Sequence, residues 1–169
     1  MAIIYGATVL KSKKLETDYS YDAIGKNSEV IAVNDPLTID SGVLKVAGTT
    51  DTIVGFAAKT ATMASDNQTV AKITPGYTPV EESALYLMGT NSDLTGNATD
   101  GGTYYKLSTA TSGAVQVDVA SGVQTTTSRV VEIVEVDPFA KGGTGSGSGL
   151  REVVVRIVKT PYTNVTITA

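Results

Sequence analysis

The chain has 169 residues, a formal net charge of -4, and neither cysteine nor histidine. The absence of cysteine excludes disulfides and thiolate metal sites, and the absence of histidine removes the commonest general base and the commonest transition-metal ligand. The acidic balance argues against a nucleic-acid partner, because neutralising phosphates requires a basic surface. No apolar stretch approaches the roughly 20 residues that span a bilayer, and no signal peptide is evident, so we expect a soluble protein made in the cytoplasm, with no membrane partner.

The composition favours strands and turns over helices. There are 17 glycines, aromatic residues make up only 6% of the chain, and threonine is frequent, so the core must consist mainly of Val, Ile, Leu and Ala. A chain of this length suits one domain with a core, or one domain plus arms. We therefore predict an all-β fold: a small antiparallel β-barrel or sandwich with an extended N-terminal arm and at most one or two short helical turns.

Residues 1–27 are predicted to form this extended arm. Residues 2–10 are typical of a strand or an extended segment, and the polar stretch that follows lacks the apolar residues needed for a core face of its own. Such a stretch is either a solvated loop or an arm that becomes ordered against a neighbouring subunit, with its lysines on an acidic surface and its tyrosines as anchors. The candidate capsid or subunit interface residues are Ile3, Ile4, Tyr5, Lys11, Lys13, Lys14, Tyr19 and Tyr21.

Residues 28–169 are predicted to form a single β domain, because short apolar runs alternate with turn signals at close spacing. The first predicted strands cover residues 29–33, 37–39, 43–47, 52–58 (with 60–63 as a continuation) and 68–73. Gly55 interrupts an apolar run and indicates a bulge or a sharp bend. Residues 74–79 contain two prolines, which are expected to break regular structure.

The second half of the chain continues the same pattern. Further strands are predicted over residues 84–88, 103–107 and 114–119, and residues 163–168 are either a last strand or an arm donated to a neighbour. The run 114–119 alternates, which places Val115, Val117 and Val119 on one face and Gln116 and Asp118 on the other.

Two Val- and Ile-rich arms flank a Gly/Ser-rich tract at residues 141–149, and the chain is organised around them. Val and Ile favour strands and the tract is flexible by composition, so we predict an antiparallel hairpin with a flexible tip. The proposed register sets Val131 opposite Ile157, Ile133 opposite Val155, Val134 opposite Val154, Glu132 opposite Arg156 and Asp137 opposite Arg151. Because apolar residues occur on both faces of both arms, the hairpin should be central and covered on both sides.

No pattern in the chain predicts a catalytic, cofactor or metal site. The loop 91–102 partly imitates a calcium loop, but its twelfth position is Gly102, where such loops carry a bidentate Glu. A Ser or Thr nucleophile would have no histidine to activate it, and the neighbours Glu81 and Glu82 would point to opposite faces of a strand. The Gly/Ser-rich tract lacks the Lys that follows a phosphate-binding loop. We therefore expect a non-enzymatic protein with no cofactor.

Several segments, in this order, resemble tailed-bacteriophage head decoration (capsid cement) proteins. The segments that carry the resemblance are residues 34–48, 51–58, 77–80, 100–107 and 129–138. The resemblance lies in the style and order of these segments, which together span roughly residues 28–138, and it carries over no specific functional residues.

The resemblance implies a virion structural protein, often trimeric, that sits on the outer capsid surface and clamps neighbouring major capsid subunits. Members of the family commonly use extended terminal arms, which fits residues 1–27. The implied partners are the major capsid protein and further copies of the chain. Two alternatives stay open on the residues alone. One is a receptor- or carbohydrate-binding β-module, such as a head fibre or adhesin, in which Tyr104 and Tyr105 would offer a stacking platform. The other is a tail-tube or other virion shell component.

Overall fold

A computed structural model of the protein describes residues 7–11, 23–92, 94, 102–109, 115–125, 127–136 and 152–161. These residues form four antiparallel β-sheets and one short helix, which confirms the all-β prediction. None of the sheets closes on itself within the described ranges, so the observed architecture is a set of open sheets packed together and not a closed barrel.

The largest sheet has five strands in the order β1-β8-β13-β12-β9. Its strands are β1 (Ala7–Lys11), β8 (Leu85–Gly89), β13 (Glu152–Ile157), β12 (Val131–Val136) and β9 (Thr103–Tyr105). The hairpin of β10 (Leu107–Thr109) and β11 (Val115–Val117) lies beside it, joined by a bridge between Thr90 and Val117. We call the five-stranded sheet and this hairpin the main lobe.

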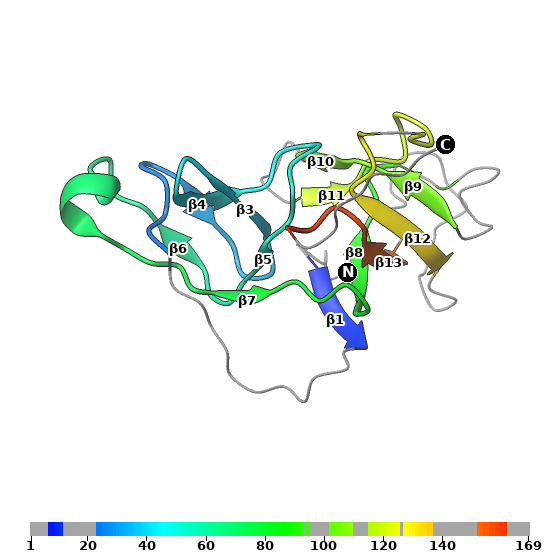
Figure 1. Ribbon diagram of the computed structural model, residues 1–169, viewed down its shortest axis with the longest axis horizontal. Coiled ribbons are helices and arrows are strands. Elements are labelled where there is room, and N and C mark those ends of the chain that lie inside the picture. The colour runs from blue at the N-terminus through cyan, green and yellow to red at the C-terminus, as the bar shows by residue number, and fades with distance from the viewer. Residues whose placement is uncertain are drawn as a thin grey trace.

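The second sheet has four strands in the order β4-β3-β5-β7. They are β4 (Val43–Val46), β3 (Pro36–Asp40), β5 (Gly55–Ala57) and β7 (Tyr77–Pro79). A two-stranded sheet of β2 (Val30–Ile31) and β6 (Ala61–Thr62), together with the π-helix η1 (Asn67–Ala71), completes the small lobe, which comprises residues 23–80. Figure 1 shows an elongated molecule, with the small lobe at one end and the main lobe at the other.

The two lobes have separate apolar clusters that meet at a shared boundary. The main cluster includes buried residues of β8, β12 and β13 and of the segments around them, and the smaller one gathers around Leu37 and Leu44. At the boundary, the N–H of Ile53 donates a hydrogen bond to the carbonyl of Lys159 at 2.9 Å. The rings of Phe56 and Tyr86 lie 4.5 Å apart between centroids, so residues of both lobes contribute to the main cluster.

The predicted hairpin is the central pair of the main sheet, and most of its described register is confirmed. Val131 pairs with Ile157, Glu132 with Arg156, and Ile133 with Val155. The register then shifts, so that Glu135, and not Val134, faces Val154. An extra residue in β12 at this point forms a bulge, which sequence alternation does not reveal. The predicted pair of Asp137 and Arg151, and the Gly/Ser-rich tip, lie outside the described residues.

Other strand predictions are wrong in the type of element or in its boundaries. The predicted strand 68–73 is instead the π-helix η1, because the side chain of Asn67 bonds across its own loop. Residues 74–79 were expected to be irregular but contain β7. Because β7 is an edge strand, it tolerates Pro79, which has no N–H to donate to a neighbouring strand.

The apolar run around Gly55 also differs from the prediction. The expected strand 52–58 is regular only over β5, and the expected continuation 60–63 is the separate strand β6, which pairs with β2. A Cβ at Gly55 would collide with the carbonyl oxygen of Thr78 and the ring of Tyr77, so this glycine permits the close approach of β5 and β7.

Two parts of the predicted N-terminal arm lie against the domain. Residues 7–11 form β1, paired antiparallel with β8. Gly25 forms a bridge with Leu44, and the N–H of Lys26 donates to the carbonyl of Leu44 at 2.8 Å. The polar composition of residues 11–27 could not reveal these contacts, because they are made by backbone groups.

Candidate functional sites: the outer edge of β1 and a buried polar cluster

The edges of the two larger sheets differ in how they are protected. The β4 edge is covered by residues 24–26, and the N–H of Val46 donates to Glu29 Oε1 at 3.1 Å. The β7 edge carries Pro79, and at the β9 edge the carbonyl of Tyr104 accepts a hydrogen bond from the N–H of Gln124 at 2.7 Å. β1 has a partner only on its β8 side within the described ranges, so its outer edge offers unpaired backbone groups to another strand.

Of the eight residues predicted from the sequence as an interface, only Lys11 falls within the described part of the chain. Lys11 ends β1 opposite Leu85, just after a register irregularity that begins at Val9. A lysine and a bulge are common devices at exposed edge strands, since both discourage indiscriminate pairing. The other seven, Ile3, Ile4, Tyr5, Lys13, Lys14, Tyr19 and Tyr21, lie outside the described residues.

The two adjacent tyrosines do not form an exposed stacking platform. Tyr105 is 2% exposed and belongs to the main apolar cluster. The ring of Tyr104 is covered by the guanidinium of Arg129, whose carbon lies 4.4 Å from the ring centroid. That guanidinium is held by the carbonyl oxygens of Gln124 at 3.3 Å and Thr125 at 2.8 Å. One ring is therefore in the core and the other is occupied by an intramolecular cation–π contact.

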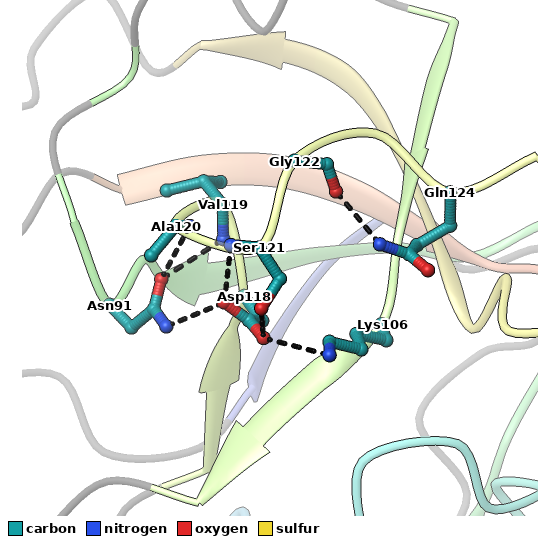
Figure 2. A network of polar contacts seen from close by, with 8 residues as sticks. All are labelled: Asn91, Lys106, Asp118, Val119, Ala120, Ser121, Gly122 and Gln124. Atoms are coloured by element: carbon teal, nitrogen blue, oxygen red, sulfur yellow. Dashed lines mark hydrogen bonds and ion pairs between the residues drawn. The ribbon is translucent and has the colours of Figure 1, made fainter.

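A network of polar contacts in the main lobe, which we call the polar cluster, consists of Asn91, Lys106, Asp118 and Ser121 (Figure 2). Asp118 is its centre and is 6% exposed. Its Oδ1 accepts hydrogen bonds from Asn91 Nδ2 at 2.8 Å and from the N–H of Ser121 at 3.1 Å. Its Oδ2 accepts a hydrogen bond from Ser121 Oγ at 2.6 Å and lies 3.5 Å from Lys106 Nζ.

The environment of Asp118 keeps its carboxyl group ionised. Burial by itself raises the pKa of Asp118, but the hydrogen bonds from Ser121 and Asn91 and the charge of Lys106 outweigh that effect, so the pKa lies below its usual value. The sequence predicted that Gln116 and Asp118 would form a polar face, yet both are 6% exposed. Asp118 contacts Asn91 and Lys106 from other segments of the chain, a long-range effect for which strand alternation gives no signal. The only local hint is the spacing of Asp118 and Ser121, which is typical of a side-chain-capped turn.

The carboxamide of Asn91 is held on both sides. Its Oδ1 accepts hydrogen bonds from the N–H groups of Val119 at 3.0 Å and Ala120 at 3.2 Å, while its Nδ2 donates to Asp118. Since backbone N–H groups only donate and a carboxylate only accepts, these partners fix which end of the amide is the oxygen. At the first position of the loop that imitates a calcium site, the side-chain oxygen is thus already engaged. Among the described residues no group of three or more acidic side chains is placed to hold a metal ion.

A second buried carboxyl group lies in the small lobe, in the turn before β3. Asp35 is 1% exposed; its Oδ2 accepts a hydrogen bond from the N–H of Ala32 at 2.8 Å, and its buried Oδ1 has no hydrogen-bond partner. Burial, assisted by the nearby negative charge of Glu29, raises the pKa of Asp35 to about 6. The sequence places this segment only between the predicted strands 29–33 and 37–39.

No family model, curated protein or solved structure matches the chain. The described part of the chain contains no helix that is both long and apolar enough to cross a membrane.

Proposed function

We propose that the protein is a virion structural protein, a capsid decoration subunit that binds the outer face of a phage head and stabilises contacts between major capsid subunits. The observation that carries the proposal is the outer edge of β1, which lies in the N-terminal segment and has no partner strand in the described part of the chain. An extended segment of a neighbouring protein adds to such an edge through main-chain hydrogen bonds.

The sequence around β1 supports this mode of attachment. Lys11 ends the strand, and Lys13 and Lys14 follow it, in a chain whose net charge is -4. A local positive group on an acidic protein orients it towards an acidic surface on the partner and increases the rate of encounter. The strand then supplies backbone pairing, while the lysines supply charge complementarity.

The rest of the described chain supports a scaffold role. The polar cluster is internally hydrogen-bonded, and β1 forms one edge of the main sheet. A decoration protein requires no chemical step at its attachment site. Its free energy of binding stabilises the shell because it binds the assembled lattice and not the separated subunits. The partners we propose are the major capsid protein and two further copies of this chain, in a homotrimer on the outer capsid surface.

Co-sedimentation with undecorated capsids tests the proposal. The wild-type protein is expected to pellet with capsids at near-stoichiometric copy number. The triple variant K11E/K13E/K14E should bind at least tenfold more weakly, because it reverses the charge that faces the partner. A matched control is K26E/K59E/K72E, which reverses three exposed lysines of the small lobe.

Two results would count against the proposal. Absence of the wild-type protein from the capsid pellet, combined with binding to a glycan array, would favour the adhesin alternative. Equal loss of binding in the triple variant and in the small-lobe control would mean that attachment depends on overall charge and not on the β1 edge.

A further inference from the structure

The polar cluster brings together the three groups needed to form an amide bond between side chains. Asn91 supplies a carboxamide, Lys106 a primary amine and Asp118 a carboxylate between them (Figure 2). They come from three separate segments, namely the end of β8, the junction of β9 and β10, and the end of β11. Their convergence is therefore a product of the fold and not of sequence proximity.

The carboxamide of Asn91 is placed as an electrophile. The two consecutive N–H groups of Val119 and Ala120 donate to its Oδ1 at 3.0 and 3.2 Å. Two backbone donors on one carbonyl oxygen constitute an oxyanion hole, which stabilises the negative charge that develops when a nucleophile adds to the carbonyl carbon. The amide nitrogen, which would leave, already donates to Asp118 Oδ1 at 2.8 Å.

The carboxylate of Asp118 is placed to transfer protons between the amine and the leaving group. Its Oδ2 lies 3.5 Å from Lys106 Nζ, so the amine and the carboxamide contact the two oxygens of one buried carboxylate. A carboxylate in this position accepts a proton from the nucleophile and donates it to the departing nitrogen. The side chain of Lys106 is 28% exposed and has a rotatable stem; attack on Asn91 would require Nζ to leave the carboxylate and reach the carboxamide carbon.

We propose that Lys106 and Asn91 form an intramolecular isopeptide bond, with Asp118 as the proton-transferring group. As the neutral amine, Lys106 Nζ attacks Cγ of Asn91, whose oxygen is stabilised by the N–H groups of Val119 and Ala120. In the tetrahedral adduct Asp118 accepts one proton from Nζ and passes it to Nδ2, and the bond between Cγ and Nδ2 then breaks. One C–N bond forms, one C–N bond breaks, and the side-chain amine and the carboxamide become a secondary amide and one molecule of ammonia. No oxidant, metal or cofactor is consumed.

The bond would join the end of β8 to the junction of β9 and β10 and close the loop between residues 91 and 106. Residues 90 and 117 already form a bridge at this point, so the crosslink would lock together the main sheet and the β10–β11 hairpin. This inference does not depend on the proposed attachment to capsids.

Intact-mass spectrometry of the purified full-length protein tests the proposal. After folding and incubation at mildly alkaline pH, the wild-type chain is expected to weigh less than its sequence by one ammonia molecule. Tryptic digestion should then yield a branched peptide that joins Lys106 to Asn91, with no cleavage after residue 106.

The matched control is Lys106→Arg, which keeps a positive charge beside Asp118 but has no primary amine. It should fold, as judged by its circular dichroism spectrum, and retain the full mass. Asp118→Asn should also retain the full mass, through loss of the proton-transferring group. A wild-type chain at full mass after prolonged incubation would overturn the proposal. Loss of ammonia from Lys106→Arg would do so too, because it would identify a cyclic imide of Asn91 in place of the crosslink.

Discussion

The main lobe and the small lobe are stabilised in different ways. In the main lobe, β12 and β13 have six residues each, and Val153, Val154 and Val155 are all buried, so both faces of the central strand are covered. The small lobe has strands of two to five residues and a smaller apolar cluster. Among the described residues, five of the six exposed large hydrophobic side chains belong to it: Val30, Val33, Ile39, Val70 and Ile73.

The backbone shows the same difference. All four non-glycine residues with positive φ in the described chain belong to the small lobe: Ser28, Asn34, Ser41 and Lys72. Left-handed backbone costs about 1 kcal/mol or more for such residues, and it persists only where other contacts impose it. The main lobe is thus stabilised mainly by strand pairing and apolar burial, whereas the small lobe depends on individual polar side chains that hold its turns. Three substitutions in the small lobe examine this difference, beginning with the one expected to have the largest effect.

Asn67→Ala should destabilise the small lobe most. Asn67 is fully buried; its Nδ2 donates to the carbonyls of Gly25 at 2.8 Å and Ile73 at 3.0 Å, and its Oδ1 accepts from the N–H of Ile73 at 2.7 Å. Truncation would leave these backbone groups without their partners, so we expect a loss of about 3–5 kcal/mol in the free energy of unfolding. Urea unfolding would measure it.

Hydrogen exchange would show whether the loss is local. In Asn67→Ala the amides of Lys26 and Leu44 should lose protection while those of β12 and β13 retain it. Equal loss in both lobes would show that they unfold as one unit and would contradict the contrast drawn between them. The control is Asn27→Ala, which removes an exposed contact with Gln68 and should cost about 1 kcal/mol or less.

Asn67 also illustrates what the sequence could and could not predict. The all-β class and the first three pairs of the β12–β13 register follow from Val- and Ile-rich runs and from opposite charges. The charged pair is present in the structure, where Arg156 Nε lies 3.6 Å from Glu132 Oε2. Those signals are local or depend on one simple pairing. The π-helix depends on an asparagine that reaches Gly25, which is distant in sequence, and no periodicity records such a contact.

The candidate sites also show that local sequence patterns do not predict contacts between residues distant in sequence. Lys11 was predicted as an interface residue from its place in a polar arm, and its interface role stays a prediction. The polar cluster was missed because Asn91, Lys106 and Asp118 look like ordinary turn residues until the fold brings them together. Asp118 was assigned to a polar face because strand alternation describes one strand and not the loops that cover it.

Asp35→Asn should stabilise the protein at neutral pH. The pKa of Asp35 is raised from 3.8 to about 6, so the folded state binds this proton more tightly than the unfolded chain does. The stabilising contribution of the protonated group is fully present below about pH 4 and is lost as the pH rises through about 6. An asparagine keeps an acceptor for the N–H of Ala32 and removes the buried charge. We therefore expect it to gain at most about 3 kcal/mol at pH 7.5.

Thermal unfolding of Asp35→Asn and the wild type across pH 4 to 8 would measure this gain. The difference in melting temperature should be largest above pH 7 and should shrink towards pH 4. Glu29 is the other acidic group close to Asp35, so Glu29→Gln is a useful companion: it should lower the pKa of Asp35 while leaving its carboxyl group buried. A pH-independent difference would mean that Asp35→Asn acts through packing, and that the turn does not hold a destabilising charge.

The smallest expected effect concerns the turn between β3 and β4. Asp40 pairs with Val43, and the two residues between them, Ser41 and Gly42, both have positive φ, at 53° and 82°. This is the geometry of a two-residue type I′ hairpin turn, for which Asn-Gly is the preferred sequence. Ser41→Asn should therefore increase the free energy of unfolding by about 0.5–1 kcal/mol, because Asn adopts left-handed backbone more readily than Ser. Ser41→Val should lower it, since a β-branched residue is strained there.

Urea unfolding of both variants and the wild type would measure these changes in the free energy of unfolding. The two changes should have opposite signs if backbone strain sets the stability of this turn. Both variants should lose stability if the 3.2 Å hydrogen bond from Ser41 Oγ to Asp40 Oδ1 matters more.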